Sequence, residues 1–521
     1  STADVENNSS YSGGLVGYSN QYVFDSYATG NVTSSSHNSG GLGGYIRLVY
    51  DSYATGDVDS TSHYVGGLVG EAQYIYDSFA TGAVAGQNSV GGLVGYQHGG
   101  NLFDSYATGS VTATGHHIGG FAGQANGTIT NAFSTGDVFG QRIVGGFIGY
   151  NSATISDSFA TGAASATGDT VGGFVGQHAG GSIDNVSSAG SAYSSGGNYV
   201  GGFAGNSSAS ISNSTALISS VNIDSGVAVS GNQYVGGFSG WNQSTITNST
   251  ATASVDGNNY TGGFVGYNHS GSISLSGAFG SVSGSNTVAG FVGHMQSGLI
   301  ESSYANSTVS GSTDSTNGRV GGFVGDHYQG SINSSRAANS VIGLGMVGGF
   351  VGYSNSSGTI DQSYATGAVT QGSGSTISTA GGVGGFAGYL GNSFTGSLTD
   401  IYAMGAVTGT QQVGGLVGYA GRGTISGGFA TGVVSSNSGD SSIGGALGFV
   451  NQTFLANTTT LPVTQSDIYF DTTTSGLLTD GVGGSSSGLA TAALKGILPS
   501  SFDSANWATG TGLYPYLSVF Y

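Results

Sequence analysis

Cysteine is absent from this chain of 521 residues, and proline and charged side chains are scarce. Without cysteine the protein forms neither disulfides nor thiolate metal sites. Lysine and arginine number 6 against 25 acidic residues, a net charge of −19, which excludes electrostatic binding to nucleic acid or to an anionic membrane. The prolines are Pro462, Pro499 and Pro515. Because proline cannot donate to a β-ladder, the long stretch before Pro462 predicts continuous strand pairing.

Long hydrophobic runs are missing too. No segment approaches the ~18 consecutive apolar residues of a membrane-spanning helix, so no membrane span is expected. The N-terminal sequence lacks the basic and apolar regions of a signal peptide; for an exported protein we expect that peptide to be removed or to lie outside this sequence. Few lysines with much serine, threonine, asparagine and glycine favour an extracellular, cell-surface protein.

What the chain has instead is a phrase that returns about sixteen times, about every 28 residues. It reads Val-Gly-Gly-Phe-Val-Gly-Tyr or a close variant, as at residues 90–96, 171–177 and 347–353. A second phrase, Asp-Ser-aromatic-Ala-Thr-Gly, follows after a short turn, as at residues 25–30 and 157–162. A fixed period predicts stacked similar units, which leave little room for a unique catalytic constellation.

Both phrases combine β-branched, aromatic and small residues, which is typical of strands of five to seven residues. A third extended piece is expected after the second phrase, as at residues 30–33, so each unit is predicted to hold three short strands and three turns. The entropy of ordering one unit exceeds what its few apolar side chains contribute, so a lone unit is unstable. The units must therefore stack, each strand pairing with its neighbours at about 4.8 Å.

Strict alternation along residues 144–150 places Phe147 and two glycines on one face and Val144, Ile148 and Tyr150 on the other. Both faces are then apolar, and one of them is expected to be covered by a second sheet or a neighbouring molecule.

In the second phrase, alternation places Ser158 and Ala160 on one face and Ile155, Asp157 and Phe159 on the other. Two interpretations stay open for the aromatic rings of both phrases. They form ladders in the core, or they form surface stripes that join subunits or bind glycans.

These patterns predict an all-β fold, a parallel β-helix-like β-solenoid of about sixteen coils over residues 11–450. Residues 1–10 are expected to form an N-terminal extension or cap. Residues 451–521 are expected to form a C-terminal capping or assembly segment, because the end of a stack is a template for another strand.

The Gly-Gly-Leu/Phe-Val-Gly phrase with its Ser-Tyr/Phe-Ala-Thr-Gly follower resembles the GLUG repeat over about residues 11–450. Residues 467–471, residues 474–476, and Trp507 with residues 514–517 are similar to the ending that often follows such arrays. The resemblance implies an extracellular β-solenoid of a bacterial or archaeal surface protein, such as the stalk of a filamentous-haemagglutinin-like adhesin. It implies no catalytic residue, and the metallopeptidase signature HExxH is absent.

No catalytic residue, metal ligand or cofactor is predicted. Glutamate occurs only at Glu6, Glu71 and Glu301, and most aspartates occupy the repeated turn position, where the side chain bonds nearby backbone. Two alternatives stay open. Aspartates on successive coils, such as Asp25 and Asp51, are candidates for binding a hard cation. Five histidines after the first phrase are interpreted as solvent-exposed turn residues, with metal or pH sensing as the alternative: His98, His178, His269, His294 and His327.

Sequons for N-glycosylation are frequent, and glycans would solvate a surface with few charges. Turn chemistry, which favours asparagine, is the alternative explanation. The predicted glycosylation sites are Asn31, Asn126, Asn185, Asn206, Asn213, Asn248, Asn306, Asn333 and Asn457.

The leading interpretation is a non-enzymatic structural protein, a subunit of a cell-surface filament or the stalk of an adhesin. Its expected partners are further copies of itself, in a homo-polymer or homo-oligomer, and glycans. The alternating, aromatic end of the chain predicts assembly contacts at Leu513, Tyr514, Tyr516, Leu517, Val519, Phe520 and Tyr521. The alternative function is a carbohydrate-binding or carbohydrate-cleaving solenoid with a groove lined by Tyr18, Tyr96, Tyr150, Tyr267 and Tyr353.

Overall fold

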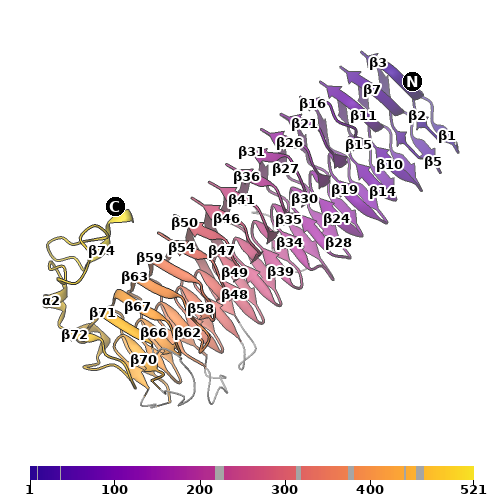
Figure 1. The fold of residues 1–521 in the computed structure, drawn as a ribbon. Coiled ribbons are helices and arrows are strands. Elements are labelled where there is room, and N and C mark those ends of the chain that lie inside the picture. Colours follow the sequence, from indigo (N-terminus) through magenta and orange to yellow (C-terminus); the bar gives the residue numbers. More distant parts are fainter. Residues whose placement is uncertain are drawn as a thin grey trace. The chain divides into compact units, whose positions relative to one another are not determined.

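The computed structural model describes residues 1–8, 10–35, 37–217, 228–311, 318–372, 381–438, 442–452 and 463–520. The fold is all-β, a parallel β-solenoid of about 15 turns with a C-terminal segment outside the repeats, which confirms the predicted fold class. The chain divides into two compact units, Ser1–Asp256 (unit 1) and Gly257–Tyr521 (unit 2), whose strands are labelled in Figure 1. No helix in the described part of the chain is long and apolar enough to cross a membrane.

One turn of unit 1 shows how the repeat folds. It contains β24 (Arg142–Gly145), β25 (Ile148–Asn151), β26 (Thr154–Ser156), β27 (Phe159–Ala160) and β28 (Ala164–Ala166). Each strand pairs in parallel with its counterpart one turn on, so that Val144 lies beside Val171 and Ile155 beside Ile183. The prediction of three strands per coil is wrong, because each phrase is interrupted in its middle and contributes two short strands.

The first phrase is interrupted at its glycines. The chain bends between β24 and β25, and Val144, Phe147 and Ile148 all reach the interior with 0% exposure. The predicted strict alternation, with one apolar face left for a second sheet, is therefore wrong. A Cβ atom on Gly146 would collide with the carbonyl oxygen of Gly173 in the next turn, so glycine is required where neighbouring turns approach most closely.

The second phrase is interrupted at its aspartate. Asp157 adopts φ +51°, in the left-handed region that aspartate and asparagine tolerate better than other non-glycine residues. This residue reverses the alternation, so that Ile155, Ser158 and Ala160 are all buried while Phe159 is 39% exposed. The expectation that Ile155 and Phe159 share a face is wrong for this reason. The same left-handed position recurs in unit 1 at Asp25, Asp51, Asp77, Asp104, Asn131, Asn185, Asn213 and Asn248.

The two phrases place their aromatic residues differently. The phenylalanines of the first phrase form buried ladders, with ring centroids 4.6–5.1 Å apart. In unit 1 this ladder contains Phe121, Phe147, Phe174, Phe203 and Phe238, and in unit 2 it contains Phe264, Phe291, Phe323, Phe350 and Phe386. The aromatic residues of the second phrase lie on the surface of unit 1.

Serines of the second phrase form an internal hydrogen-bonded ladder beneath those surface rings. The Ser78 hydroxyl donates to the carbonyl oxygen of Tyr76 (2.6 Å) and accepts from the backbone N–H of Ser52 (3.1 Å). Ser105 repeats this arrangement on the next turn. Each buried serine thereby satisfies a backbone donor at the left-handed corner, where the regular strand ladder is interrupted.

Strand pairing continues beyond both ends of the predicted array of residues 11–450. Residues 5–7, within the predicted extension, form β1 (Val5–Asn7) and pair with β5 (Val32–Ser34). In unit 2, β71 (Thr464–Asp471) pairs with β67 (Thr424–Ala430), so the ladder continues beyond residue 450.

The chain after β71 is irregular. It contains α1 (Thr472–Ser475), β72 (Ser487–Leu489), α2 (Thr491–Leu494), β73 (Trp507–Ala508), β74 (Tyr516–Leu517) and a 3₁₀ helix at Ser518–Phe520. The buried carboxylate of Asp471 caps α1 by accepting from the backbone N–H groups of Thr473 and Thr474. We call residues 498–520 the tail.

Candidate assembly surface

Unit 1 carries a continuous stack of rings on its surface. Neighbouring centroids lie 4.7–5.3 Å apart and neighbouring ring planes deviate by 9° at most. The two end rings are exposed, Tyr27 to 45% and Phe159 to 39%, and the four rings between them are half-buried. We call this stack the aromatic column: Tyr27, Tyr53, Phe79, Tyr106, Phe133 and Phe159.

The geometry of the column decides what it can contact. Each inner ring has both faces against its neighbours, so the ring edges, which carry the positive end of the quadrupole, point outward. Ring edges favour the tilted or perpendicular approach of another aromatic side chain. A flat ligand that stacks on a ring face finds such a face only at the ends of the column.

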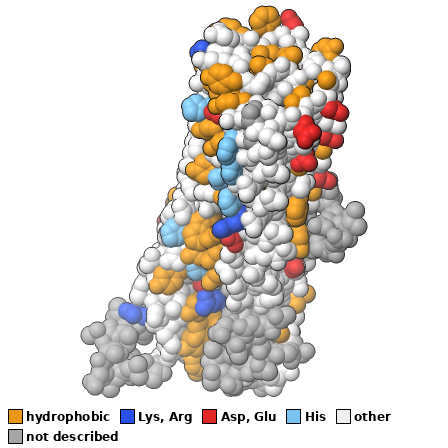
Figure 2. Space-filling view, turned by 90° about the vertical axis from the view of Figure 1, so that its right-hand side faces the viewer, with side chains coloured by type: hydrophobic (Ala, Val, Ile, Leu, Met, Phe, Trp, Pro, Cys, Tyr) orange, Lys and Arg blue, Asp and Glu red, His pale blue; other side chains and the backbone are white. Residues whose placement is uncertain are grey.

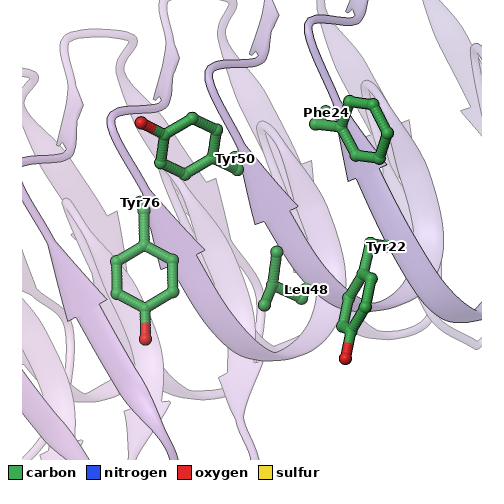
Figure 3. Close-up of a pocket in the computed structure, with 5 residues that line it drawn as sticks. All are labelled: Tyr22, Phe24, Leu48, Tyr50 and Tyr76. Carbon is green, nitrogen blue, oxygen red and sulfur yellow. The ribbon is translucent and has the colours of Figure 1, made fainter.

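A second group of exposed rings lies at the start of unit 1, on β3 (Val16–Phe24), β7 (Gly43–Tyr50) and β11 (Val69–Tyr76). Five side chains line an apolar surface pocket of about 460 Å³, shown in Figure 3. Tyr22 is 57% exposed and Phe24 60%, well above what these residues show in a core. We call this group the N-terminal patch: Tyr22, Phe24, Leu48, Tyr50 and Tyr76.

An exposed aspartate separates the patch from the column on successive turns. The sequence reads Phe-Asp-Ser-Tyr at residues 24–27, Tyr-Asp-Ser-Tyr at 50–53 and Tyr-Asp-Ser-Phe at 76–79. The left-handed backbone of Asp25, Asp51 and Asp77 places the rings before and after it both on the surface. Unit 1 thus repeats one surface element: an aromatic ring, a carboxylate and a second aromatic ring.

Three aromatic residues at the same position of the repeat in unit 2 are buried, whereas Tyr304 and Tyr469 at that position are half-buried. Tyr364 and Tyr402 stack at 4.6 Å, and Tyr402 and Phe429 at 5.1 Å. Their exposed fractions are only 9%, 3% and 0%. The side chains that cover them belong to the tail: Leu498, Phe502, Trp507, Tyr514, Leu517 and Phe520.

Trp507 and Phe520 of the tail contact the rings of unit 2 at steep angles, whereas Tyr514 lies 6.3 Å from Phe429 at 21°. Trp507 lies 6.0 Å from Tyr402 at 51° and 5.7 Å from Phe429 at 54°, and Phe520 is perpendicular to Tyr364 at 4.7 Å. These are the approaches that outward ring edges favour.

Hydrogen bonds fix the tail on the left-handed residue of the same turn. Asp400, at φ +48°, accepts from the Trp507 indole Nε1 and from the Asn506 amide Nδ2, both at 2.7 Å. On the preceding turn, Gln362 at φ +44° donates to Asn506 Oδ1 (3.1 Å). The tail therefore recognises a carboxylate and the ring two residues after it, which is part of the surface element of unit 1.

The predicted assembly residues mostly lie within this covering of unit 2. Leu517 is fully buried, Tyr516 is half-buried, and the Tyr514 hydroxyl donates to Asp471 Oδ2 (2.6 Å). Burial and the Asp471 carboxylate raise the pKa of Tyr514 to about 12. Leu513 and Val519 are 54% and 50% exposed, and Tyr521 lies outside the described residues. Trp507 belongs to the ending that resembles other such arrays, but its hydrogen bond to Asp400 was not predicted, because the two residues lie 107 positions apart.

The tyrosines that end the first phrase do not form a uniform groove. Tyr18 is 52% exposed, whereas Tyr96, Tyr150, Tyr267 and Tyr353 are half-buried. Glutamate or glutamine occupies the same position on other turns, as at Glu71 and Gln124.

The five predicted histidines occupy three environments. His98 and His269 are exposed, as expected. His178, His294 and His327 are buried, so the prediction of solvent exposure is wrong for them. Burial lowers the pKa of His178 to about 4, and its ring bridges Asn151 Nδ2 and the carbonyl oxygen of Ser210. His178 and His327 occupy an inward position at the end of the phrase that asparagine fills on other turns, so the phrase alone could not distinguish them from surface residues.

His294 belongs to a buried ion cluster in unit 2. Its Nδ1 lies 3.0 Å from Asp326 Oδ2, which also accepts from the guanidinium of Arg319. Burial raises the pKa of Asp326, but hydrogen bonds and charges from His294 and Arg319 outweigh it and hold that pKa below its usual range. The Arg319 guanidinium also lies 4.3 Å from the Tyr353 ring centre. The carboxylate of Asp326 is thus paired with two neighbouring side chains inside unit 2.

Other histidines lie at the surface, where Figure 2 shows histidine side chains next to hydrophobic ones. His37 and His63 stack at 5.2 Å on neighbouring turns. Within the described ranges, no group of three or more histidine, aspartate or glutamate side chains is arranged to hold a metal ion. Asp25 and Asp51 lie on successive turns without such a group around them.

The predicted glycosylation sites also differ among themselves. Asn206 and Asn333 are half-buried, and Asn457 lies outside the described residues. Three exposed ones, Asn185, Asn213 and Asn248, have left-handed backbones and donate from their amide nitrogens to a neighbouring turn. Turn chemistry explains asparagine at these three positions. The remaining exposed sites are Asn31, Asn126 and Asn306.

Comparison with known proteins yields one match. The family model described as the GLUG motif matches residues 86–112, 114–138 and 231–256, all in unit 1. No curated protein and no solved structure matches the chain. The chain is a β-solenoid protein that carries GLUG motif repeats.

Proposed function

We propose that this GLUG-repeat β-solenoid is a non-enzymatic structural protein at the cell surface, a subunit of an extracellular filament or the stalk of an adhesin. The exposed aromatic column of unit 1 carries the proposal. Six stacked rings, exposed at both ends of the stack and half-buried between, continue the exposed rings of the N-terminal patch, and contiguous apolar surfaces of this kind mark interaction sites. The periodic interior, built of phenylalanine and serine ladders, supports a mechanical rather than a catalytic role.

Few charges and abundant small polar residues support the extracellular placement. Glycans on the exposed sequons Asn31, Asn126 and Asn306 would add solubility, and mass spectrometry of protein purified from its own source tests their presence. The outward ring edges of the column give less support to glycan binding, since a sugar ring packs against an aromatic face.

The test is self-association of the full chain. Sedimentation velocity over a hundredfold concentration range, with electron microscopy of the most concentrated sample, is expected to show oligomers or filaments. Separate monomers throughout would refute the filament subunit and leave only the stalk. A glycan array with clear binding, lost on substitution of Tyr18 or Tyr353, would instead favour the carbohydrate-binding alternative.

A further inference from the structure

The aromatic column of unit 1 and the rings under the tail in unit 2 occupy the same position of the repeat. In both units a left-handed residue precedes the ring by two positions, as Asp51 precedes Tyr53 and Asp400 precedes Tyr402. Beneath the tail in unit 2 Tyr402 is only 3% exposed, whereas in unit 1 the inner ring Tyr53 is half-buried and the end ring Tyr27 is 45% exposed. The molecule therefore shows both an open form of this surface and the segment that covers it.

Unit 1 offers the tail more than unit 2 does. The tail contacts four rings at this position of unit 2, and two of the left-handed residues that precede them are acidic: Gln362 and Gly427 precede Tyr364 and Phe429, whereas Asp400 and Asp467 precede Tyr402 and Tyr469. In unit 1 the corresponding residues of the first four turns are all aspartates: Asp25, Asp51, Asp77 and Asp104. Each of them can accept the indole and amide donors that Asp400 accepts.

Unit 1 also has a second row of rings. Where Phe24, Tyr50 and Tyr76 precede the aspartates, unit 2 has the polar residues Asp361, Thr399 and Ser426. The N-terminal patch therefore adds apolar contact area that the tail lacks in its own unit 2.

Charge favours the tail over a second copy of the column. Two columns packed face to face would bring the rows Asp25, Asp51 and Asp77 of both copies together, and like charges in close contact are destabilising. The tail contains one acidic residue, Asp503, and presents the Trp507 indole and the Asn506 amide as donors.

We propose that the tail of one copy docks on the aromatic column and N-terminal patch of unit 1 in a second copy, leaving its own site in unit 2. The inference rests on the proposed function and names the contact through which copies associate. Exchange of one segment between identical chains is a low-cost route to association. Because the contact joins the end of one chain to the start of the next, it is heterologous and extends into a filament unless the ring closes.

The proposal predicts opposite effects for two substitutions in unit 2. Trp507→Ala removes the indole that contacts the carboxylate and rings, and is expected to weaken association at least tenfold, as for a buried tryptophan in an interface. Tyr402→Ser weakens the tail's own site and frees the tail, so it is expected to strengthen association several-fold. General damage to unit 2 would weaken association in both variants.

Substitutions in unit 1 test the receiving surface. The double variant Tyr53→Ser with Phe79→Ser is expected to lose association. The control Phe139→Ser changes a ring that is 46% exposed on β23 (Val138–Gly140), outside the column, and is expected to associate like the unchanged chain.

The decisive measurement mixes the two inactive variants in sedimentation velocity. Trp507→Ala lacks a working tail and the double variant lacks a working column, so each alone stays monomeric, while the mixture forms one-to-one dimers through the single intact contact. Association of the unchanged chain with no effect of Trp507→Ala would overturn the docking and leave the proposed function in place. A monomeric mixture, or weaker association of Tyr402→Ser, would also overturn it. A monomeric unchanged chain would refute filament assembly itself.

Discussion

The glycines of the first phrase lie where the backbones of neighbouring turns approach most closely, and an alanine at Gly173 tests this directly. A Cβ atom at this position would stand 2.2 Å from the carbonyl oxygen of Gly202 in the next turn, where real Cβ contacts stay above 3.0 Å. The turns must then separate locally by about 0.8 Å, although their backbones are held by parallel ladders on both sides. Overpacking of this kind typically costs about 1–3 kcal/mol.

Gly180, in the same turn, is the matched control. A Cβ atom there would meet only Ser152, at 3.6 Å or more, and the backbone of Gly180 is not left-handed. Gly180→Ala is expected to be neutral or to stabilise by roughly 0.4–1 kcal/mol, because alanine restricts the unfolded chain.

Hydrogen exchange followed by mass spectrometry suits this comparison, since a repeat protein opens locally rather than as a whole. At about 1.4 kcal/mol per factor of ten, peptides spanning residues 171–206 should exchange roughly 5- to 150-fold faster in Gly173→Ala. Peptides from unit 2 should be unaffected. Equal exchange rates in Gly173→Ala and Gly180→Ala would refute the argument that the glycines are required by close backbone approach.

Three further predictions concern buried polar groups. Ser303→Ala removes the hydroxyl that accepts from the Ser276 backbone N–H (3.3 Å) and donates to the carbonyl oxygen of Glu301 (2.8 Å). The loss should destabilise unit 2 by about 1–3 kcal/mol and accelerate hydrogen exchange of the Ser276 amide. Unchanged exchange would contradict a stabilising role of the serine ladder. Because burial holds the pKa of His178 at about 4, against 6.5 for the unfolded residue, stability should fall by roughly 3 kcal/mol as the pH drops from 6.5 to 4. His178→Asn introduces the asparagine found at this position on other turns, so its free energy of unfolding in urea should not show this fall with pH. The same pH dependence in both proteins would contradict the assignment to His178. Burial raises the pKa of Asp471, but hydrogen bonds from Tyr514, Thr491 and the backbone outweigh burial and hold that pKa below its usual value. The stabilisation that the Asp471 carboxylate gives the folded protein is therefore present above about pH 4 and is lost as the pH falls through the depressed pKa. Proteolysis of the tail should therefore accelerate only in strong acid, whereas Asp471→Ala should expose it at neutral pH; resistance of this variant would mean that the tail docks without the capping carboxylate.

The repeat period, the missing prolines and the strand-forming composition were enough to predict the fold class, because stacking is a property of the whole pattern. Which side chains point into the interior and which to the surface was predicted less well. Alternation assumes a regular strand, and both phrases break that assumption, one at Gly146 and the other at Asp157. The second break had a visible signal, since aspartate or asparagine returns at this position on every turn of unit 1 from Asp25 to Asn248.

The candidate surface was predictable only in part. Sequence placed aromatic residues in the second phrase and marked the end of the chain as an assembly segment. It could not show that Trp507 and Asn506 meet Asp400, because that contact joins positions more than 100 residues apart. The cluster of His294, Arg319 and Asp326 was equally hidden, since its members meet only when the turns are in register.

The close approach of backbones at the glycines also bears on how such a chain varies in evolution. In unit 1, 25 residues separate Val65 from Val90 and 29 separate Val171 from Val200, yet both pairs lie in the same register. Extra residues are accommodated between strands, so the rise per turn is independent of turn length. Duplication or loss of one whole turn would change only the number of turns. Recombination within the gene could therefore adjust the length of such a solenoid without altering how its turns pack.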